Sequence, residues 1–311
     1  METLLEIFLK AGGVLHVVLE KTVLFVLIII ERKKIKMNNN LLFLIFQFVI
    51  LFSCQSENID DLLEQIKLPA GFEISIYADN LSGARSMTQT GNGILFVGTR
   101  KQGVIYALVD KNNDNVIDEK YQVIKNLNNP NGVSFIDGSL YVAEIHRIIR
   151  LKDIINNLNK PPEPEIVFSD LPKDTWHGWK YLSYGPDGFL YFPIGAPCNV
   201  CESENSIYAS LLRIKPDGTG FEIFASGIRN TVGFDWHPVT GELWFTDNGR
   251  DWLGDNLPPD ELNHAPEKGF HFGFPHFHGN SIRDSEYVKV KIGKIIKSRQ
   301  KSLVLMLQLW E

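Results

Sequence analysis

The chain has 311 residues, of which 44% are hydrophobic and 22% charged, with 25 Gly and 15 Pro. This composition supports a folded core and excludes wholesale disorder, and the aromatic share of 11%, including 20 Phe, favours β-rich packing over a helical bundle. The formal net charge is −6, but residues 37–287 hold 19 Lys+Arg against 32 Asp+Glu, a net of −13. Because such an acidic body repels phosphate backbones, the sequence predicts no nucleic-acid partner and favours neutral substrates or bound cations.

The first 54 residues differ from the rest and predict a signal or anchor segment. A basic cluster at 32–36 precedes Met37, and residues 41–53 form an apolar run broken by one polar residue. A run of this length is typical of the apolar core of a secretory signal, because a membrane span needs about 20 residues. The run ends at Cys54 in a sequence that resembles a bacterial lipoprotein signal, in which the cysteine carries the lipid.

Two interpretations of this segment remain open. The first is a membrane anchor that starts at Met1, with Cys54 incidental. The second is export with lipidation at Cys54 and translation from Met37, which would make residues 1–36 spurious. Both place the body in the periplasm or at the cell envelope, and residues 55–67 are then expected to form a polar tether.

A short pattern recurs four times in the body, as Gly, a spacer residue, then Leu followed by an aromatic and a hydrophobic residue. The four leucines are Leu95, Leu140, Leu190 and Leu243, spaced by 45, 50 and 53 residues. Short strands, tight turns and a period of about 40–50 residues are typical of four-stranded propeller blades. A β-sandwich would explain the strands but not the repeat. The sequence therefore predicts an all-β protein with a β-propeller fold.

The blades are expected within residues 68–287, where about four are visible. A propeller must close on itself, because an open ring leaves blade edges exposed. Residues 288–311 lose the rhythm of Gly, Asp and aromatic residues and become Lys-rich, so they are expected to form an atypical tail and not a further blade. We therefore expect a chain that is truncated or frame-shifted at its C-terminus.

His177 is the candidate general base. It lies close to Trp176 and Trp179, just before a predicted strand. Neighbouring indoles remove water from an imidazole and favour its neutral, proton-accepting form. A buried histidine that only packs and bonds to a carbonyl is the alternative.

Two further segments offer ligand-binding groups. Arg229 and Asn230 follow a Gly at the entrance of a strand, where they present a cation and an amide to an anionic or carbonyl oxygen; an arginine that bridges two blades is the alternative. Residues 246–263 contain five carboxylates together with Asn side chains and loop carbonyls. This donor set suits Ca²⁺, with a solvated acidic loop as the alternative.

A second candidate calcium loop and a cysteine pair are weaker signals. The loop would use oxygen ligands from Asp110, Asn112, Asp114 and Asp118. A plain hairpin turn is the alternative, because the usual glycine of such loops is replaced by Asn115. Three Cys are too few for a disulfide scaffold, and no His follows the pair Cys198 and Cys201, which excludes c-type haem attachment. In an oxidising compartment this pair predicts a disulfide, with a free redox pair as the alternative.

Several motifs of the body occur in one order, namely His177-Gly178, Gly185–Gly188, Gly227–Asn230, Asp260–Asn263 and Lys268–Pro275. This order resembles the pyrroloquinoline quinone (PQQ)-dependent glucose/sorbosone dehydrogenases, which are six-bladed propellers of the bacterial periplasm. The element 198–201 looks like that of the sorbosone dehydrogenase branch. The resemblance covers roughly residues 68–279.

The resemblance implies roles for the candidate residues. His177 would take the hydroxyl proton while hydride passes to the quinone, and Ala196 stands where glucose-type members carry an Asp near this histidine. The cofactor would be bound by Arg229, Asn230 and Asn248, with Arg229 stabilising charge on the quinone oxygen. The calcium ligands would come from Gly249, Arg250, Asp260 and Glu261, although Arg250 replaces the usual Pro.

The sequence thus predicts a PQQ- and Ca²⁺-dependent oxidoreductase that oxidises an alcohol or aldehyde carbon of a small sugar. Its electron acceptor is not identified by the sequence, and it would be held at the membrane by the lipid or the N-terminal segment. We expect the chain to bind PQQ weakly or not at all and to oxidise sugars poorly, because the resemblance places further basic cofactor contacts in later blades that the sequence lacks. The alternatives are a calcium-dependent lactone hydrolase on a similar propeller and a non-catalytic propeller that serves as a binding module.

Overall fold

A computed structural model describes residue 63 and residues 65–254, 256–279, 282–287 and 303–304. The predicted signal segment with Cys54, most of the predicted tether and most of the predicted tail lie outside the described residues. The chain divides into two compact units, Met1–Asn80 and Leu81–Glu311, and all strands named below belong to the second. Within the described ranges, no helix has the length and apolar character that a bilayer crossing requires.

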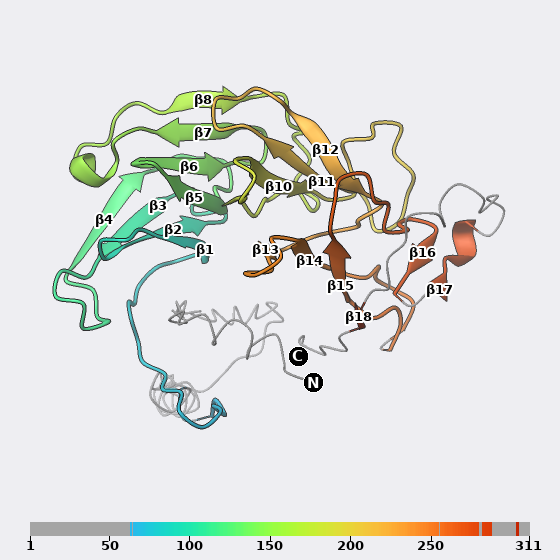
Figure 1. The fold of residues 1–311 in the computed structure, drawn as a ribbon, viewed down its shortest axis with the longest axis horizontal. Coiled ribbons are helices and arrows are strands. Elements are labelled where there is room, and N and C mark those ends of the chain that lie inside the picture. Colours follow the sequence, from blue (N-terminus) through green and yellow to red (C-terminus); the bar gives the residue numbers. More distant parts are fainter. Residues whose placement is uncertain (1–62, 64, 255, 280–281, 288–302, 305–311) are drawn as a thin grey trace, which may run out of the picture. The chain divides into compact units, whose positions relative to one another are not determined.

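Four antiparallel sheets of four strands each build the second unit (Figure 1). The first sheet contains β1 (Ala84–Gln89), β2 (Ile94–Thr99), β3 (Ile105–Val109) and β4 (Glu119–Ile124). The second contains β5 (Gly132–Ile136), β6 (Ser139–Ala143), β7 (Ile148–Leu151) and β8 (Glu165–Phe168). The third contains β9 (Ser183–Tyr184), β10 (Leu190–Ile194), β11 (Ser210–Ile214) and β12 (Glu222–Ser226). The fourth contains β13 (Phe234–Trp236), β14 (Leu243–Asp247), β15 (Glu261–Ala265) and β18 (Leu303–Val304).

The four leucines of the sequence repeat occupy equivalent places, since they lie in β2, β6, β10 and β14, the second strand of each sheet. Each sheet is a blade in which consecutive strands pair with their neighbours, and the first three blades follow chain order throughout. The prediction of an all-β propeller with four blades in this chain is therefore confirmed. The first blade begins at Ala84, later than the expected start of the propeller region.

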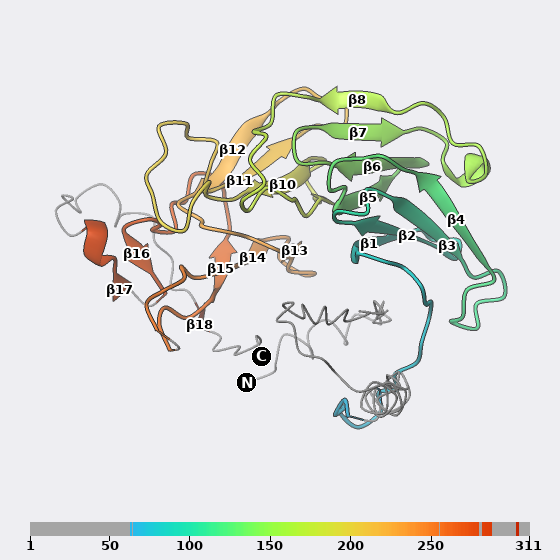
Figure 2. The same cartoon turned by 180° about the vertical axis from the view of Figure 1, so that it is seen from behind.

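Figures 1 and 2 show the blades from opposite sides, and apolar side chains pack between neighbouring blades. One cluster joins the first and second blades, one the second and third, and one the third and fourth; they contain Phe96 with Leu140, Ile148 with Phe192, and Leu211 with Phe245, respectively. Each fully buried side chain of this size contributes about 1.5–3 kcal/mol to stability. This stacking fixes how the connections of one blade lie against those of the next.

The fourth blade takes its last strand from the segment that was expected to be a separate tail. Strand β18 pairs antiparallel with β15, with Val304 opposite Glu261 and Leu303 opposite Leu262. These two residues of the expected tail therefore add a strand to the fourth blade, and the boundary at residue 288 stays a prediction. A two-residue strand has no recognisable sequence pattern, which is why the sequence analysis missed it. Between β15 and β18 lie the short strands β16 (Phe277–His278) and β17 (Ile282–Arg283) and the 3₁₀ helix η2 (Ser285–Tyr287); a second such helix, η1 (Ile155–Asn157), follows β7.

Two kinds of connection meet at one end of the blades. Chain direction alternates between antiparallel strands, so the connection from the second to the third strand lies at the same end as the connection from the fourth strand to the next blade. This end therefore carries the β8–β9, β10–β11, β12–β13 and β14–β15 connections. They contain His177, Arg229, Asn230, both cysteines of the predicted disulfide and residues 248–260, whereas the candidate calcium loop at 110–118 joins β3 to β4 at the opposite end.

Candidate functional site

The backbone of Ala196 connects the candidate base with the candidate arginine. Its N–H donates to the carbonyl of Arg229 at 2.8 Å, and its carbonyl lies 2.9 Å from Nδ1 of His177. Gly195 leaves room for this contact, because a Cβ there would lie 2.5 Å from Cβ of His177 and 3.1 Å from the carbonyl oxygen of Arg229. The structure thus brings the β8–β9, β10–β11 and β12–β13 connections together at the site.

His177 is held as a neutral imidazole with one nitrogen available. The carbonyl of Ala196 can only accept a hydrogen bond, so Nδ1 must carry the proton and Nε2 keeps its lone pair. Burial and the positive charge of Arg229 lower the pKa of His177 to about 4. The backbone of His177 has φ +49°, a left-handed conformation that a non-glycine residue adopts at some cost in energy. A carbonyl therefore replaces the Asp that the resemblance expects, and it fixes the tautomer without adding negative charge.

Arg229 is almost completely buried and its guanidinium is fully bonded to protein oxygens. Nε donates to the carbonyl of Asn199 at 2.8 Å, and Nη1 donates to the carbonyls of Asn248 and Gly249 at 3.3 and 2.6 Å. Nη2 donates to Oδ1 of Asn199 at 2.8 Å and to Oδ2 of Asp251 at 3.1 Å. These five contacts use all five donors of the side chain. In this arrangement Arg229 ties the third blade to the β14–β15 connection, which agrees with the bridging alternative.

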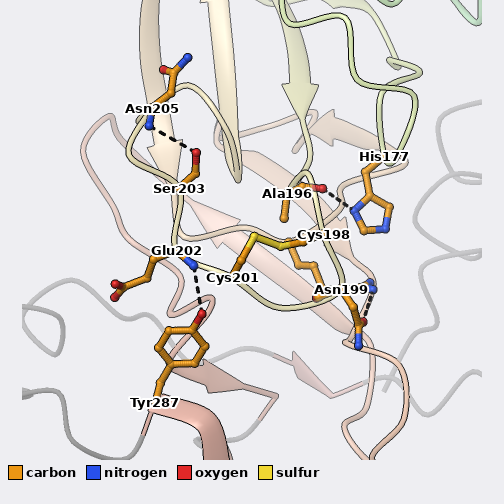
Figure 3. The surroundings of a disulfide bond; sticks show 10 residues. His177, Ala196, Cys198, Asn199, Cys201, Glu202, Ser203, Asn205 and Tyr287 are labelled. Carbon is orange, nitrogen blue, oxygen red and sulfur yellow. Dashed lines mark hydrogen bonds between the residues drawn. A yellow bond between two sulfur atoms is a disulfide. The ribbon is translucent and has the colours of Figure 1, made fainter.

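Asn199 was not predicted as a site residue, yet it organises the site. Besides its contacts to Arg229, its side chain accepts from the N–H of Asp251 at 2.8 Å and donates to the carbonyl of Asp251 at 3.1 Å. Asn199 lies inside the loop closed by a disulfide between Cys198 and Cys201, close to the contact of His177 with Ala196 (Figure 3). The sequence shows the pattern Cys-Asn-Val-Cys. It does not show the partners of Asn199, because Arg229 and Asp251 lie on other connections of the propeller.

Asp247, the last residue of β14, binds the connection that leads into the fourth blade. Its carboxylate accepts from the backbone N–H groups of Arg229 at 3.0 Å and Asn230 at 2.6 Å. Asp247 lies opposite Glu261 in the β14–β15 ladder, and burial together with the charge of Glu261 raises the pKa of Asp247. Asn230 in turn accepts from the N–H of Asn248 at 3.2 Å through its carbonyl. The predicted cofactor residues Asn230 and Asn248 are thus neighbours of Arg229.

A small open pocket, with a volume of about 10 Å³ accessible to water, lies beside these residues. Oxygen-bearing and charged groups line one part of it and three phenylalanines line another; the polar part comprises Arg229, Asp247, Asn248, Gly249, Glu261 and His278. Carbonyl and carboxylate oxygens are the donors that Ca²⁺ prefers. The chemistry of this lining fits the predicted cation, although no group of three or more His, Cys, Asp or Glu residues is placed to hold a metal in the described part of the chain.

The remaining predicted calcium ligands have protein partners. Asp260 accepts from the N–H of Gly249 at 2.8 Å, and Glu261 accepts from the N–H of Gly279. The guanidinium of Arg250 forms ion pairs with the carboxylates of Asp284 at 2.6 Å and Glu286 at 3.0 Å, so this side chain is not available to a ligand. These contacts hold the β14–β15 connection against the segment that follows β16.

The loop from Asp110 to Asp118 adopts the hairpin alternative in its hydrogen bonding. It joins β3 to β4, and Asp110 accepts from the N–H groups of Asp114 at 3.3 Å and Asn115 at 3.0 Å. Asn112 likewise accepts from the N–H of Asp114, and Asp118 accepts from that of Lys111 at 2.7 Å. Such side chain–backbone bonds are those of an ordinary polar turn. Calcium binding by this loop stays a prediction.

Lys180 is a second residue that the sequence analysis missed. Its side chain is almost completely buried, and Nζ donates to the carbonyls of Ile145 at 2.6 Å and Gly178 at 2.7 Å. Burial lowers its pKa to about 7. The contact to Gly178 holds the residue that follows His177, so Lys180 supports the left-handed backbone at the candidate base. A lysine before a strand gives no signal of burial in the sequence.

The chain belongs to the family described as "Domain of unknown function (DUF7133)", which matches residues 59–271. An uncharacterized protein of Borreliella burgdorferi is 31% identical over 259 residues, which is 79% of this chain and 65% of that protein. The chain therefore spans less than two thirds of the length of this relative.

Three solved structures show the same fold. A Trichoderma reesei enzyme of Carbohydrate-Active Enzymes Family AA12 is 17% identical with a TM-score of 0.64, covering 75% of this chain and 70% of that enzyme. The PQQ domain of pyranose dehydrogenase from Coprinopsis cinerea is 13% identical with a TM-score of 0.59, covering 71% and 60%. The PQQ-bound aldose sugar dehydrogenase from Streptomyces coelicolor is 20% identical with a TM-score of 0.55, covering 73% and 68%. Identities this low show the fold and not the substrate.

Proposed function

We propose that the chain is an oxidoreductase of the PQQ-dependent sugar dehydrogenase type, which oxidises an alcohol or aldehyde carbon of a sugar. The observation that carries this proposal is the state of His177, whose Nδ1 is fixed by the carbonyl of Ala196 and whose pKa is lowered to about 4. A neutral imidazole with a free Nε2 is the form that a general base needs at neutral pH. The propeller fold, shared with PQQ-binding enzymes, supports the same class of reaction.

In the proposed reaction, Nε2 of His177 accepts the proton of the sugar hydroxyl while the carbon gives up its hydrogen as hydride and becomes a carbonyl. When bound, PQQ supplies the two-electron acceptor for that hydride. Asn230 and Asn248, which lie beside Arg229, would hold the cofactor, and Ca²⁺ would be held by backbone oxygens of Gly249 and Arg250 together with Glu261. Arg229 keeps the site assembled by fixing the β14–β15 connection.

We further propose that the protein works outside the cytoplasm. The disulfide between Cys198 and Cys201 supports this location, because disulfides persist in oxidising compartments and are rare in the cytosol. Lipidation at Cys54 would then hold the protein at a membrane, and a separate electron acceptor would reoxidise the quinone. Metabolic labelling with a palmitate analogue tests the lipidation, since Cys54→Ser should abolish the label.

The experiment that tests the reaction compares His177→Asn with His237→Asn in the full chain, after addition of PQQ and Ca²⁺. His237 lies in the β13–β14 turn, at the opposite end of the blades from the site. We expect PQQ-dependent reduction of a dye by at least one sugar in a broad panel, at a low rate. Loss of a positioned base should reduce this rate about 10²–10⁴-fold in His177→Asn and leave it unchanged in His237→Asn.

Absence of PQQ-dependent oxidation in the unsubstituted chain, or equal rates in both variants, would overturn the proposal. Hydrolysis of lactones that needs Ca²⁺ but not PQQ would establish the hydrolase instead. Sugar binding without turnover under either condition would point to a binding module.

A further inference from the structure

Two arginines of the first blade share the indole of Trp179. The guanidinium carbon of Arg85 lies 5.1 Å from the ring centroid, and that of Arg100 lies 5.3 Å from it. Arg85 is in β1, Arg100 directly follows β2, and Trp179 belongs to the β8–β9 connection. The first blade and the connection from the second to the third blade therefore meet at one aromatic ring, on which both cations are held by cation–π attraction.

This pair of cations has no anionic partner within the described residues. Neither Arg85 nor Arg100 forms an ion pair there, whereas Arg150, Arg213 and Arg250 each pair with at least one carboxylate. Partial burial and the charge of Arg100 lower the pKa of Arg85, and because both side chains are exposed, only solvent offsets their mutual repulsion. In a body with a net charge of −13, an uncompensated pair of arginines is unexpected.

The adjacent residue, Lys180, is a further basic group, but it is buried and its lowered pKa of about 7 keeps it from adding a full positive charge at neutral pH. Lys180 follows Trp179 directly, and its ammonium contacts only the two backbone carbonyls described above. The main chain of Lys180 is also tied to the first blade, because its carbonyl accepts from Asn131 at 2.7 Å and Asn131 accepts from Ser86 at 3.2 Å. Hydrogen bonds from β1 through Asn131 thus fix the position of the β8–β9 connection beside the arginines.

This cluster lies at the same end of the blades as the candidate base. Trp179 is two residues from His177 on the same connection, and Arg100 begins the β2–β3 connection, which is equivalent to the connections that carry Asn199 and Asp251. A ligand bound beside His177 would therefore lie at the same end of the blades as Arg85 and Arg100.

We propose that Arg85, Arg100 and Trp179 form a subsite for a carboxylate of the ligand that binds beside His177. The planar guanidinium matches a carboxylate with two parallel hydrogen bonds, and a negative group between two arginines removes their mutual repulsion. The carboxylate comes either from the quinone cofactor or from an acidic sugar, such as a uronic acid. The role of this subsite in a reaction at His177 rests on the proposed function. Its binding of a carboxylate does not depend on that function.

The test measures binding by titration calorimetry at low ionic strength, with PQQ, glucuronate and glucose as separate probes. The double variant Arg85→Gln/Arg100→Gln is compared with Lys101→Gln, which removes a positive charge from the same connection and is exposed like the two arginines, but does not stack on Trp179. We expect the double variant to lose at least about tenfold in affinity for the acidic probe that uses the subsite, while Lys101→Gln changes it less than twofold. Binding of glucose, where it occurs, should not change.

The two sources of the carboxylate are separated by the probe that responds. A loss for PQQ alone assigns the subsite to the cofactor, and a loss for glucuronate alone assigns it to an acidic substrate. Failure of the unsubstituted chain to bind either acid, or equal losses in the double variant and in Lys101→Gln, would overturn the proposal. Circular dichroism and thermal unfolding of each variant establish that it is folded, and Trp179→Phe, which keeps an aromatic face, provides a second variant with a smaller expected loss.

The dehydrogenase proposal and the subsite proposal fail in different ways. If sugar oxidation is absent but glucuronate binding depends on the arginine pair, the subsite stands and the dehydrogenase falls. If oxidation depends on His177 but no probe senses Arg85 and Arg100, the dehydrogenase stands and the subsite falls.

Discussion

The side chain of Asn199 bonds to both backbone polar groups of Asp251, accepting from its N–H at 2.8 Å and donating to its carbonyl at 3.1 Å. The same side chain receives a hydrogen bond from Arg229 at 2.8 Å. One amide therefore holds the β14–β15 connection and the guanidinium next to the candidate base in a single arrangement. Because Asn199 and Arg229 are buried, the loss of this amide leaves the guanidinium of Arg229 with an unpaired donor, while Asp251 is exposed and can bond to water.

Asn199→Ala should lower the free energy of unfolding by about 1–3 kcal/mol, the usual cost of leaving buried polar groups without a partner. Asn205→Ala is the matched control, because Asn205 lies on the same β10–β11 connection but is exposed. Denaturant unfolding followed by tryptophan fluorescence measures both. A change in Asn199→Ala no larger than that in Asn205→Ala would show that the amide does not support the site.

The disulfide that encloses Asn199 should stabilise the folded chain modestly. Chain-entropy arguments give about 2 kcal/mol for a loop as short as that between Cys198 and Cys201. We expect dithiothreitol to lower the melting temperature of the unsubstituted chain and to leave that of Cys198→Ser/Cys201→Ser unchanged. An equal response of both proteins to the reductant would contradict this assignment.

Arg250→Met should be strongly destabilising, by about 3–5 kcal/mol, because it leaves the carboxylate of Asp284 buried without its cation. Adding Asp284→Asn should recover part of the loss, since a neutral amide needs no counter-charge. Arg150→Met is the control: its partner Glu165 is exposed, and the cost there should be below about 1 kcal/mol. Unfolding curves of the unsubstituted chain, Arg250→Met, Asp284→Asn, their double variant and Arg150→Met test this directly, and additive effects in the double variant would refute the coupling.

His177 should make folding stability depend on pH. Its pKa is about 4 in the folded protein and 6.5 in an unperturbed histidine, so between these values the unfolded chain binds a proton that the folded chain does not. Stability is therefore lost as pH falls from 6.5 towards 4. His177→Gln keeps a donor for Ala196 but does not titrate, and it should lose less stability over this window than the unsubstituted chain. Melting temperatures at pH 6.5 and 4.5 decide the matter, and an equal decrease in both proteins would be evidence against a depressed pKa.

The fold could be predicted from the sequence because its signal is local. Each second strand combines a glycine turn with Leu and an aromatic residue, and a repeat of such units admits few architectures. His177 and Arg229 could also be singled out, since each stands beside glycines or indoles in the sequence itself. Both residues are then expected at one end of the blades, because the connections of successive blades occupy equivalent places.

The rest of the site depends on contacts between blades, which no local pattern encodes. Arg85 meets Trp179 across two blades, and Asn199 finds Asp251 on the neighbouring connection. Residue type was equally uninformative for Lys180, because lysine is almost always exposed and its burial here is decided by two distant carbonyls. The calcium roles of Gly249, Asp260 and Glu261 stay predictions.

The pairing of β18 with β15 sets an order on the formation of the blades. In the first three blades every strand follows its neighbour closely, so each can form as soon as its own residues have left the ribosome. The fourth blade cannot be completed until Leu303 and Val304 have been synthesised, because they supply the strand that pairs with Glu261 and Leu262. Until then β15 presents an unpaired edge to the solvent, and such edges recruit strands from other chains. The interval between synthesis of β15 and synthesis of β18 therefore adds one more unpaired edge, at Glu261 and Leu262, to the nascent protein.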